Sequence, residues 1–145
     1  MNQIFEAKVK FDKELDNAEI KTVTESFVVE AMSFTEAEAT ITQQMIPYVG
    51  EGNEFTITAL NKRSYEDVLP DNIGGFWYHI KVGYENLDEK SGEIKYNFEL
   101  YLIQALDFKE VVKKTFDYLK DSVTDFKVDA IKETKILDTY LYQKD

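Results

Sequence analysis

The first part of the chain recurs in its second half, and this internal repeat constrains the fold more than any other feature. The offset between the two copies is 73 residues in the first segment, 74 in the middle and 71 at the end, so it changes only where loops would absorb a difference in length. A pattern that recurs at a nearly fixed spacing indicates two copies of one structural unit. The matched segments are 8–11 with 81–84, 20–21 with 94–95, 34–36 with 108–110 and 55–60 with 126–131, together with Glu25 and Glu99, and Ala31 and Ala105.

Each copy has the pattern of two strands, a helix and a third strand. Residues 5–11 and 20–31 alternate between the two sides of a half-buried strand, which predicts an antiparallel hairpin. Ser33 and Glu36 then have the spacing of a capping box, and apolar residues follow at helical spacing. Residues 55–59 alternate again. Each copy is therefore predicted to be ββαβ.

These elements predict an α+β fold with a mainly antiparallel sheet, six principal strands and two helices. We expect residues 1–145 to form a single compact domain of two tandem ββαβ repeats, at about 1–69 and 76–145, with a junction at 70–75. A pseudo-twofold would relate the repeats and give a continuous sheet or a half-barrel. Because the junction contains Pro and Gly but is too short for a free linker, the halves are expected to touch.

The tail of each copy is less constrained. Residues 61–69 either extend the third strand or cross toward the second copy. Residues 134–141 are expected to extend the last strand.

The copies differ on one face of their long second strand. A strand that is apolar on both faces is normally buried on both. Packing within the chain, a second chain or other partner, and a ligand are three ways to cover that face. The apolar set is Tyr96, Phe98, Leu100 and Leu102 in the second copy, where the first copy has Thr22, Thr24, Ser26 and Val28.

The second hairpin also interleaves aromatic side chains with lysines. Single-strand binders stack bases on such sheets, although a β-rich core uses the same residue types. Trp77 and His79 are two residues apart on one strand, so their side chains are expected to lie on the same, outward face. The net charge of −11 and the single arginine, Arg63, weigh against base-specific recognition of duplex DNA. The candidate residues for nucleic-acid or partner binding are Trp77, Tyr78, His79, Lys81, Lys95, Tyr96, Phe98 and Leu100.

The sequence shows no constellation for catalysis or metal binding. His79 is the single histidine and has no nucleophile or metal-ligand pattern around it, and there is no cysteine. Residues 12–17 space three carboxylates as a calcium loop does, but the glycine at the sixth position and the glutamate at the twelfth, here Val23, are missing. We therefore expect no catalytic residues, no metal, no cofactor and no enzymatic activity.

Composition and one resemblance bear on the compartment. Without a signal-peptide pattern, an apolar run of about 20 residues or a cysteine, the chain is expected to be cytoplasmic and not membrane-bound. KVKF at 8–11, SFTEAEA at 33–39, FTIT at 55–58 and ETKILD at 133–138 together resemble a family of unknown function from Bacteroidetes and their phages. The resemblance implies a protein of a bacterial cell or a phage-infected host, and it brings no catalytic residues.

The leading functional hypothesis is a non-catalytic binding protein that presents its second hairpin to a partner, as an accessory of nucleic-acid metabolism. One alternative is a single-stranded nucleic-acid binder that uses Trp77, Tyr78, His79 and Lys81 with Lys95. Another is a phage virion or anti-defence protein that acts by protein contact. Self-association into a homodimer through the apolar face is a further expectation.

Overall fold

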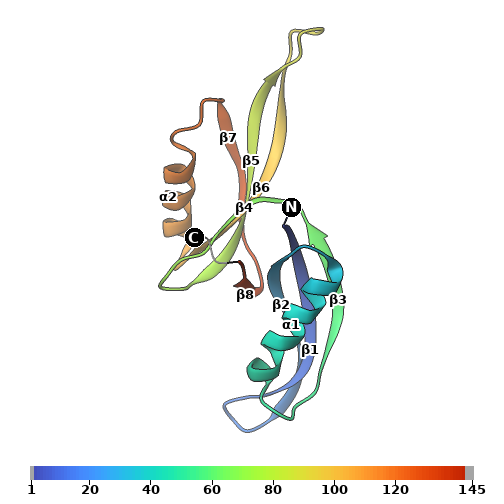
Figure 1. Cartoon of the computed structure of the whole chain (residues 1–145). Coiled ribbons are helices and arrows are strands. Elements are labelled where there is room, and N and C mark those ends of the chain that lie inside the picture. The colour runs from blue at the N-terminus through green and yellow to red at the C-terminus, as the bar shows by residue number, and fades with distance from the viewer. Residues whose placement is uncertain (1, 143–145) are drawn as a thin grey trace. The chain divides into compact units, whose positions relative to one another are not determined.

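Residues 2–142, which the computed structural model describes, form eight strands and two helices (Figure 1). They divide into two compact units. Unit 1 comprises the described residues up to Arg63 and those from Lys135 onward, and unit 2 comprises Ser64–Thr134. The elements are β1 (Gln3–Glu14), β2 (Ile20–Ala31), α1 (Phe34–Val49), β3 (Phe55–Arg63), β4 (Tyr65–Leu69), β5 (Phe76–Leu87), β6 (Ile94–Ala105), α2 (Phe108–Leu119), β7 (Phe126–Glu133) and β8 (Ile136–Tyr140).

Each unit has one four-stranded sheet and one helix. The strand order is β3-β1-β2-β8 in unit 1 and β7-β5-β6-β4 in unit 2. Three strands of each sheet are antiparallel, and the fourth pairs in parallel. The predicted α+β class and the tandem ββαβ pattern are confirmed. The strand count and the continuous sheet differ from the prediction: the two tails form strands of their own, so the described residues have eight strands in two four-stranded sheets.

The two units repeat the same pairing in detail. β1 and β2 pair from Gln3 opposite Ala31, and β5 and β6 pair from Phe76 opposite Ala105. The register shifts after Lys8 where β1 meets β3, and at the equivalent place after Lys81 where β5 meets β7. Even this irregularity is conserved between the copies.

The last strand of each repeat lies in the other unit. β4 follows β3 in the first repeat, but it pairs with β6 in unit 2. β8 follows β7 in the second repeat, but it pairs with β2 in unit 1. Residues 61–69 therefore include a strand that crosses, one of the two expected outcomes. The expectation that residues 134–141 extend the preceding strand is wrong, because they cross as well. Each unit therefore consists of the first four elements of one repeat and the last strand of the other repeat.

Strand direction makes this exchange unavoidable. β2 and β3 run in the same direction, because each is antiparallel to β1. The strand that pairs with the outer edge of β2 is parallel to β2. A chain that leaves the end of β3 would therefore have to run back along the full length of the sheet before it could form a strand at that edge. Parallel neighbours need a connection of about a dozen residues. Ser64 alone separates β3 from β4, and two residues separate β7 from β8, so neither repeat can complete its own sheet.

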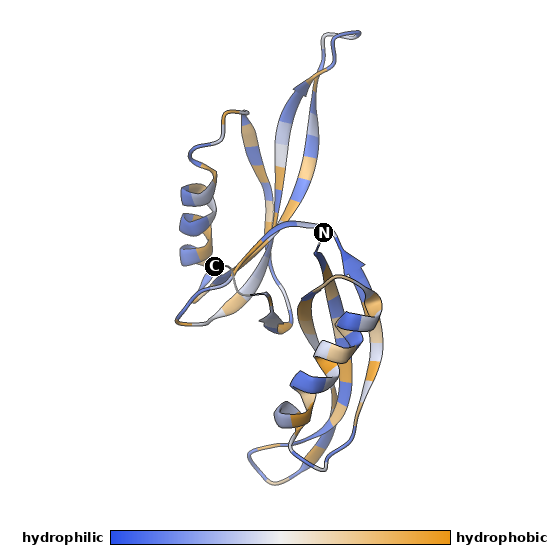
Figure 2. Cartoon of the chain, in the orientation of Figure 1, coloured by the Kyte–Doolittle hydropathy of each residue, from blue (hydrophilic) through white to orange (hydrophobic). Residues whose placement is uncertain are grey.

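Each unit has its own hydrophobic core between the helix and one face of its sheet. Alternate residues along a strand point to opposite faces, and bands of hydrophobic and hydrophilic residues alternate along the strands in Figure 2. The buried cluster of unit 1 is Phe5, Ala7, Val9, Phe11, Phe27, Val29, Ala31, Ala37, Ile41 and Met45. That of unit 2 is Tyr78, Ile80, Val82, Tyr101, Ile103, Ala105, Val111 and Leu119.

Both helices begin with the predicted capping box. Ser33 Oγ accepts a hydrogen bond from the backbone N–H of Glu36 at 3.1 Å, and the Glu36 carboxylate accepts one from the N–H of Met32 at 3.2 Å. In unit 2, Asp107 accepts from the N–H of Glu110 at 2.8 Å. Glu110 likewise accepts from the N–H of residue 106, at 3.2 Å. Side chains thus satisfy backbone donors at each helix start that lack a partner within the helix.

We expect Ser33→Ala and Asp107→Ala each to lower the free energy of unfolding by about 1 kcal/mol, because each leaves a helix start without its cap. Urea unfolding followed by circular dichroism measures the loss. Asp117→Ala, at an exposed position of α2, is the control and should change stability by less than about 0.5 kcal/mol. An Asp107→Ala loss no larger than that of the control would contradict the role of the cap.

Tyrosine hydroxyl groups join α2 to the exchanged strand β4, and β5 to β6. Tyr118 of α2 donates a hydrogen bond to Asp67 of β4 at 2.8 Å. Tyr84 and Tyr101 share a hydrogen bond of 2.6 Å between their hydroxyls, and Tyr101 also donates to Glu99 at 3.1 Å. Burial and the bond to Asp67 raise the pKa of Tyr118 to about 12. Burial and the bonds to Tyr84 and Glu99 also raise the pKa of Tyr101.

These pKa shifts predict alkaline unfolding. Because the folded-state pKa of Tyr118 lies above its ordinary value of 10.0, the stabilisation is complete below pH 10 and is lost as the pH rises through about 12. In a titration of tyrosinate absorbance, a late group of tyrosines, Tyr118 among them, should ionise only well above pH 10, together with loss of circular dichroism. Tyr118→Phe should reduce the late group. Ionisation of all tyrosines in one step near pH 10 would contradict this prediction.

Candidate functional site

The face of the unit 2 sheet that points away from α2 carries an exposed group of aromatic, aliphatic and lysine side chains. Tyr78, Ile80 and Val82 of β5 point into the core beneath α2, so the alternate residues of β5, β6 and β7 point to the opposite face. We call this surface the aromatic face. Its residues are Lys81 from β5, Tyr96, Phe98 and Leu100 from β6, and Lys127 from β7.

Two rings lie side by side on the aromatic face, with lysines over them. The centroids of Tyr96 and Phe98 are 6.3 Å apart. The Nζ atom of Lys81 lies 4.5 Å from the centroid of Phe98. The Nζ atom of Lys127 lies 4.1 Å from the centroid of Tyr96 and 5.8 Å from that of Phe98, within the range of cation–π attraction. Phe98 is 48% exposed and Leu100 39% exposed, so the group is open to a ligand.

A glycine makes room for the two rings. Gly83 is paired directly with Phe98 across β5 and β6. A Cβ atom at this position would lie 2.9 Å from a ring carbon of Phe98 and 3.3 Å from one of Tyr96. The rings therefore pack on the bare backbone of β5, an arrangement in which an aromatic residue covers a glycine on the neighbouring strand. Sequence reasoning missed Gly83 and Lys127, although an aromatic residue predicted opposite a glycine was a usable signal.

Charge on the aromatic face is partly balanced. Lys81 forms an ion pair with Asp129 of β7, with 3.7 Å between Nζ and a carboxylate oxygen. This pair is exposed, so it adds little to stability. It does hold Lys81 near the ring of Phe98.

Four of the eight predicted site residues gather on the aromatic face: Lys81, Tyr96, Phe98 and Leu100. Two others are buried. Trp77 is only 1% exposed, so the expectation that its indole faces outward is wrong. Alternation along the strand predicts correctly which face of the sheet Trp77 lies on. It does not predict whether that part of the face is covered. Tyr78 is 4% exposed and packs edge-on against Phe108 of α2, as the core of unit 2 requires.

The remaining two predicted residues lie apart from the rings. His79 is half-buried on the same face, where its Nε2 atom shares a 2.5 Å hydrogen bond with the hydroxyl of Tyr65 from the exchanged strand β4. Lys95 precedes Tyr96 on β6, so its side chain lies on the other face of the sheet. It forms a 3.1 Å ion pair with Asp88 near the hairpin loop. The bond from Lys95 lowers the pKa of that carboxyl group.

Unit 1 has no aromatic counterpart of this surface at the equivalent positions. Thr22, Thr24 and Ser26 stand where unit 2 has Tyr96, Phe98 and Leu100. Lys10 stands at the position of Gly83, so no ring packs on a bare backbone there. The hydroxyl of Thr22 instead donates to Asp12 at 2.6 Å. The two copies share a backbone but differ in this surface.

Two further observations concern the kind of site. Among residues 2–142, no cluster of three or more His, Asp or Glu side chains is arranged to hold a metal ion. Neither of the two described helices is long and apolar enough to span a membrane.

Residues 3–142 match the family model described as Domain of unknown function (DUF4494). The chain belongs to this family. The match spans nearly the whole sequence and confirms the expectation of an uncharacterised family. No curated protein and no solved structure matches the chain.

We expect Gly83→Ala to displace the ring of Phe98 while the fold is retained, because the added Cβ would lie 2.9 Å from it. Ring currents should shift the side-chain ε-CH₂ resonance of Lys81 upfield in the wild type. Gly83→Ala should return it toward the value of a free lysine, as Phe98→Leu should. Two-dimensional ¹H–¹³C NMR measures this shift. Lys10→Ala, the matched change in unit 1, should leave the resonance in place, and an unchanged Lys81 resonance in Gly83→Ala would contradict the packing.

Proposed function

We propose that this DUF4494 protein is a non-catalytic binding protein whose aromatic face binds single-stranded nucleic acid. The observation that supports this most is the pair of adjacent rings, Tyr96 and Phe98, with the ammonium groups of Lys81 and Lys127 over them. Stacking platforms for single strands combine these two residue types on a sheet surface. The role extends to an accessory protein of nucleic-acid metabolism in the cytoplasm of a bacterial cell or a phage-infected host.

The spacing of the rings favours an extended single strand. Their centroids are 6.3 Å apart, about twice the 3.4 Å rise per nucleotide of a stacked duplex strand. Bases that stack on both rings must therefore be separated from each other, which a single strand allows at low energetic cost. The phenyl and phenol rings accept any base, so this surface favours binding without strong sequence preference.

The two lysines have a role in both the free and the bound state. In the free protein they lie over the exposed rings and shield them from water. A base that stacks on a ring takes the place of the ammonium group, which can move on its flexible side chain to a phosphate oxygen. With about two such phosphate contacts, the logarithm of the association constant should fall with the logarithm of salt concentration with a slope of about −1.4. The net charge of −11 opposes binding at long range, so the affinity should be modest.

We expect the wild-type protein to raise the anisotropy of a fluorescein-labelled 20-mer of oligo(dT) at low salt. Phe98→Ala and Tyr96→Ala should each weaken binding by about 5- to 160-fold, because base–ring stacking contributes about 1–3 kcal/mol per base. The matched changes Thr24→Ala and Thr22→Ala in unit 1 should leave the affinity unchanged. No anisotropy change at 20 mM salt and 200 µM protein, or equal losses in the matched variants, would reject the proposal.

A protein partner is the second candidate, and the exposure of Leu100 supports it. This side chain is 39% exposed beside Phe98, and a leucine offers contact area but no stacking. Binding of a protein through this patch would be insensitive to salt and would be lost in Leu100→Glu. The same patch could pair two copies of the chain as a homodimer, or serve a virion or anti-defence protein. Sedimentation of wild type and Leu100→Glu separates self-association from the other cases.

A further inference from the structure

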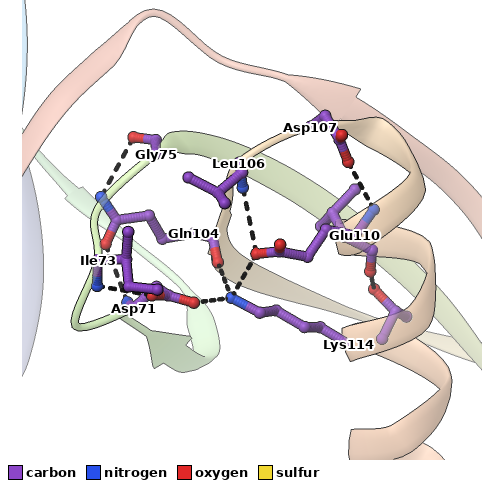
Figure 3. A network of polar contacts seen from close by, with 10 residues as sticks. Asp71, Ile73, Gly75, Gln104, Leu106, Asp107, Glu110 and Lys114 are labelled. Carbon is purple, nitrogen blue, oxygen red and sulfur yellow. Dashed lines mark hydrogen bonds and ion pairs between the residues drawn. The ribbon is translucent and has the colours of Figure 1, made fainter.

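The loop of residues 70–75 joins the exchanged strand β4 to β5, the first strand of the second repeat. In the unit 2 sheet, β6 lies between these two strands. Neighbouring strands are about 4.8 Å apart, so the loop must cross about 10 Å and also pass around the end of β6. Figure 3 shows the polar contacts that hold it there. This loop alone links the first repeat to the second along the chain.

A half-buried lysine of α2, Lys114, fixes the path of this loop. Lys114 forms an ion pair with Asp71 of the loop, contacts Glu110 at 3.0 Å and donates to the backbone carbonyl of Gln104 at 3.0 Å. The backbone N–H of Asp71 in turn donates to the side chain of Gln104 at 2.9 Å. We call these four residues the Lys114 latch (Figure 3). The bond from Lys114 lowers the pKa of Asp71, so both partners are charged at neutral pH.

The end of the loop fits closely against β6. Gly75 has a φ of +126°, and a Cβ atom there would lie 2.4 Å from the carbonyl oxygen of Ala105. The carbonyl of Gly75 also accepts a hydrogen bond from the Gln104 side chain at 3.2 Å. The loop is therefore shaped for the closed path, in which β4 and β5 of one chain lie in the same sheet.

Unit 1 contains the same junction without a loop. Glu30 occupies the position of Gln104, and its two carboxylate oxygens accept hydrogen bonds from the Asn2 side chain and the Tyr142 backbone N–H, each at 3.0 Å. Asn2 and Tyr142 correspond to Gly75 and Asp71, but they are separated by the whole described chain. A unit thus forms with these two positions unconnected, so unit 2 does not need its loop to complete its sheet.

We propose that two copies of this chain form a strand-exchanged dimer by opening the loop of residues 70–75. The first repeat of one copy then pairs with the second repeat of the other, and vice versa. Every pairing of β4 with β6 and of β8 with β2 is retained, as are both cores. The Lys114 latch holds the loop closed and favours the one-chain form.

The short connections after β3 and β7 are what make a strand-exchanged dimer possible. Each repeat must donate its last strand to another repeat, because the connections after β3 and β7 are too short for return. The loop merely determines whether that other repeat belongs to the same chain. In the one-chain form the loop supplies a high effective concentration of the second repeat. Once the loop cannot close, a second copy is the remaining source of a matching repeat.

Deletion of residues 71–74 tests the proposal in the full chain. It leaves Pro70 and Gly75 between Leu69 and Phe76, which span at most about 11 Å when fully extended and cannot pass around β6. Light scattering after size-exclusion chromatography should give about twice the monomer mass, with a wild-type circular dichroism spectrum. A folded monomer would overturn the proposal.

A second variant keeps the test decisive if the deletion does not fold. Lys114→Met retains the loop but removes the latch. Unlabelled and ¹⁵N-labelled Lys114→Met chains, refolded together from urea at 1 mM, should give mixed dimers in a 1:2:1 ratio by native mass spectrometry. The dimer fraction should exceed that of wild type at least threefold, whereas Lys109→Met, an exposed lysine of α2, should match wild type. Absence of mixed dimers in Lys114→Met would overturn the proposal.

Discussion

A single-residue connection governs the architecture of this chain. β2 and β3 run in the same direction, and the strand that pairs with the outer edge of β2 is parallel to it. That strand must therefore begin at the end of the sheet where β2 and β3 begin, whereas the chain leaves β3 at the other end. Ser64 is too short a link for β4 to reach that position. Each repeat therefore completes the other repeat's sheet, and neither ββαβ sequence is an independent folding unit. A second repeat, from the same chain or from another copy, is consequently a structural requirement of the present fold.

The two copies share the interactions that stabilise the backbone but differ in one exposed surface. The capping boxes at Ser33 and Asp107 and the paired registers maintain the same scaffold in both units. The surface opposite the helix differs: Thr24 stands in unit 1 where unit 2 exposes Phe98. An exposed ring contributes little to folding and increases the risk of aggregation. Its presence in one copy, packed on Gly83 with lysines over it, is the difference between the copies on which the proposed binding role rests.

Sequence reasoning was accurate where the determinants are local. The helix starts follow from four-residue capping patterns, and the strands follow from alternation, so both could be read directly. The exchange could not, since periodicity shows that residues 136–140 form a strand but not which sheet they join. Trp77 was misjudged for a related reason: its parity defines a face, whereas burial depends on what covers that face. Lys127 was missed because its contact with Tyr96 depends on pairing between β5 and β7, which are far apart in sequence.

The aromatic face does not depend on whether the loop at 70–75 is closed or open. Every residue of the aromatic face, from Lys81 to Lys127, belongs to the second repeat, which stays within one chain whether the loop at 70–75 is closed or open. The face should therefore be intact in both forms, since β5, β6 and β7 keep their pairing. A strand-exchanged dimer would carry two such faces in one particle. A long single strand that reaches both would be held with an affinity greater than either face provides alone, because the second contact becomes intramolecular.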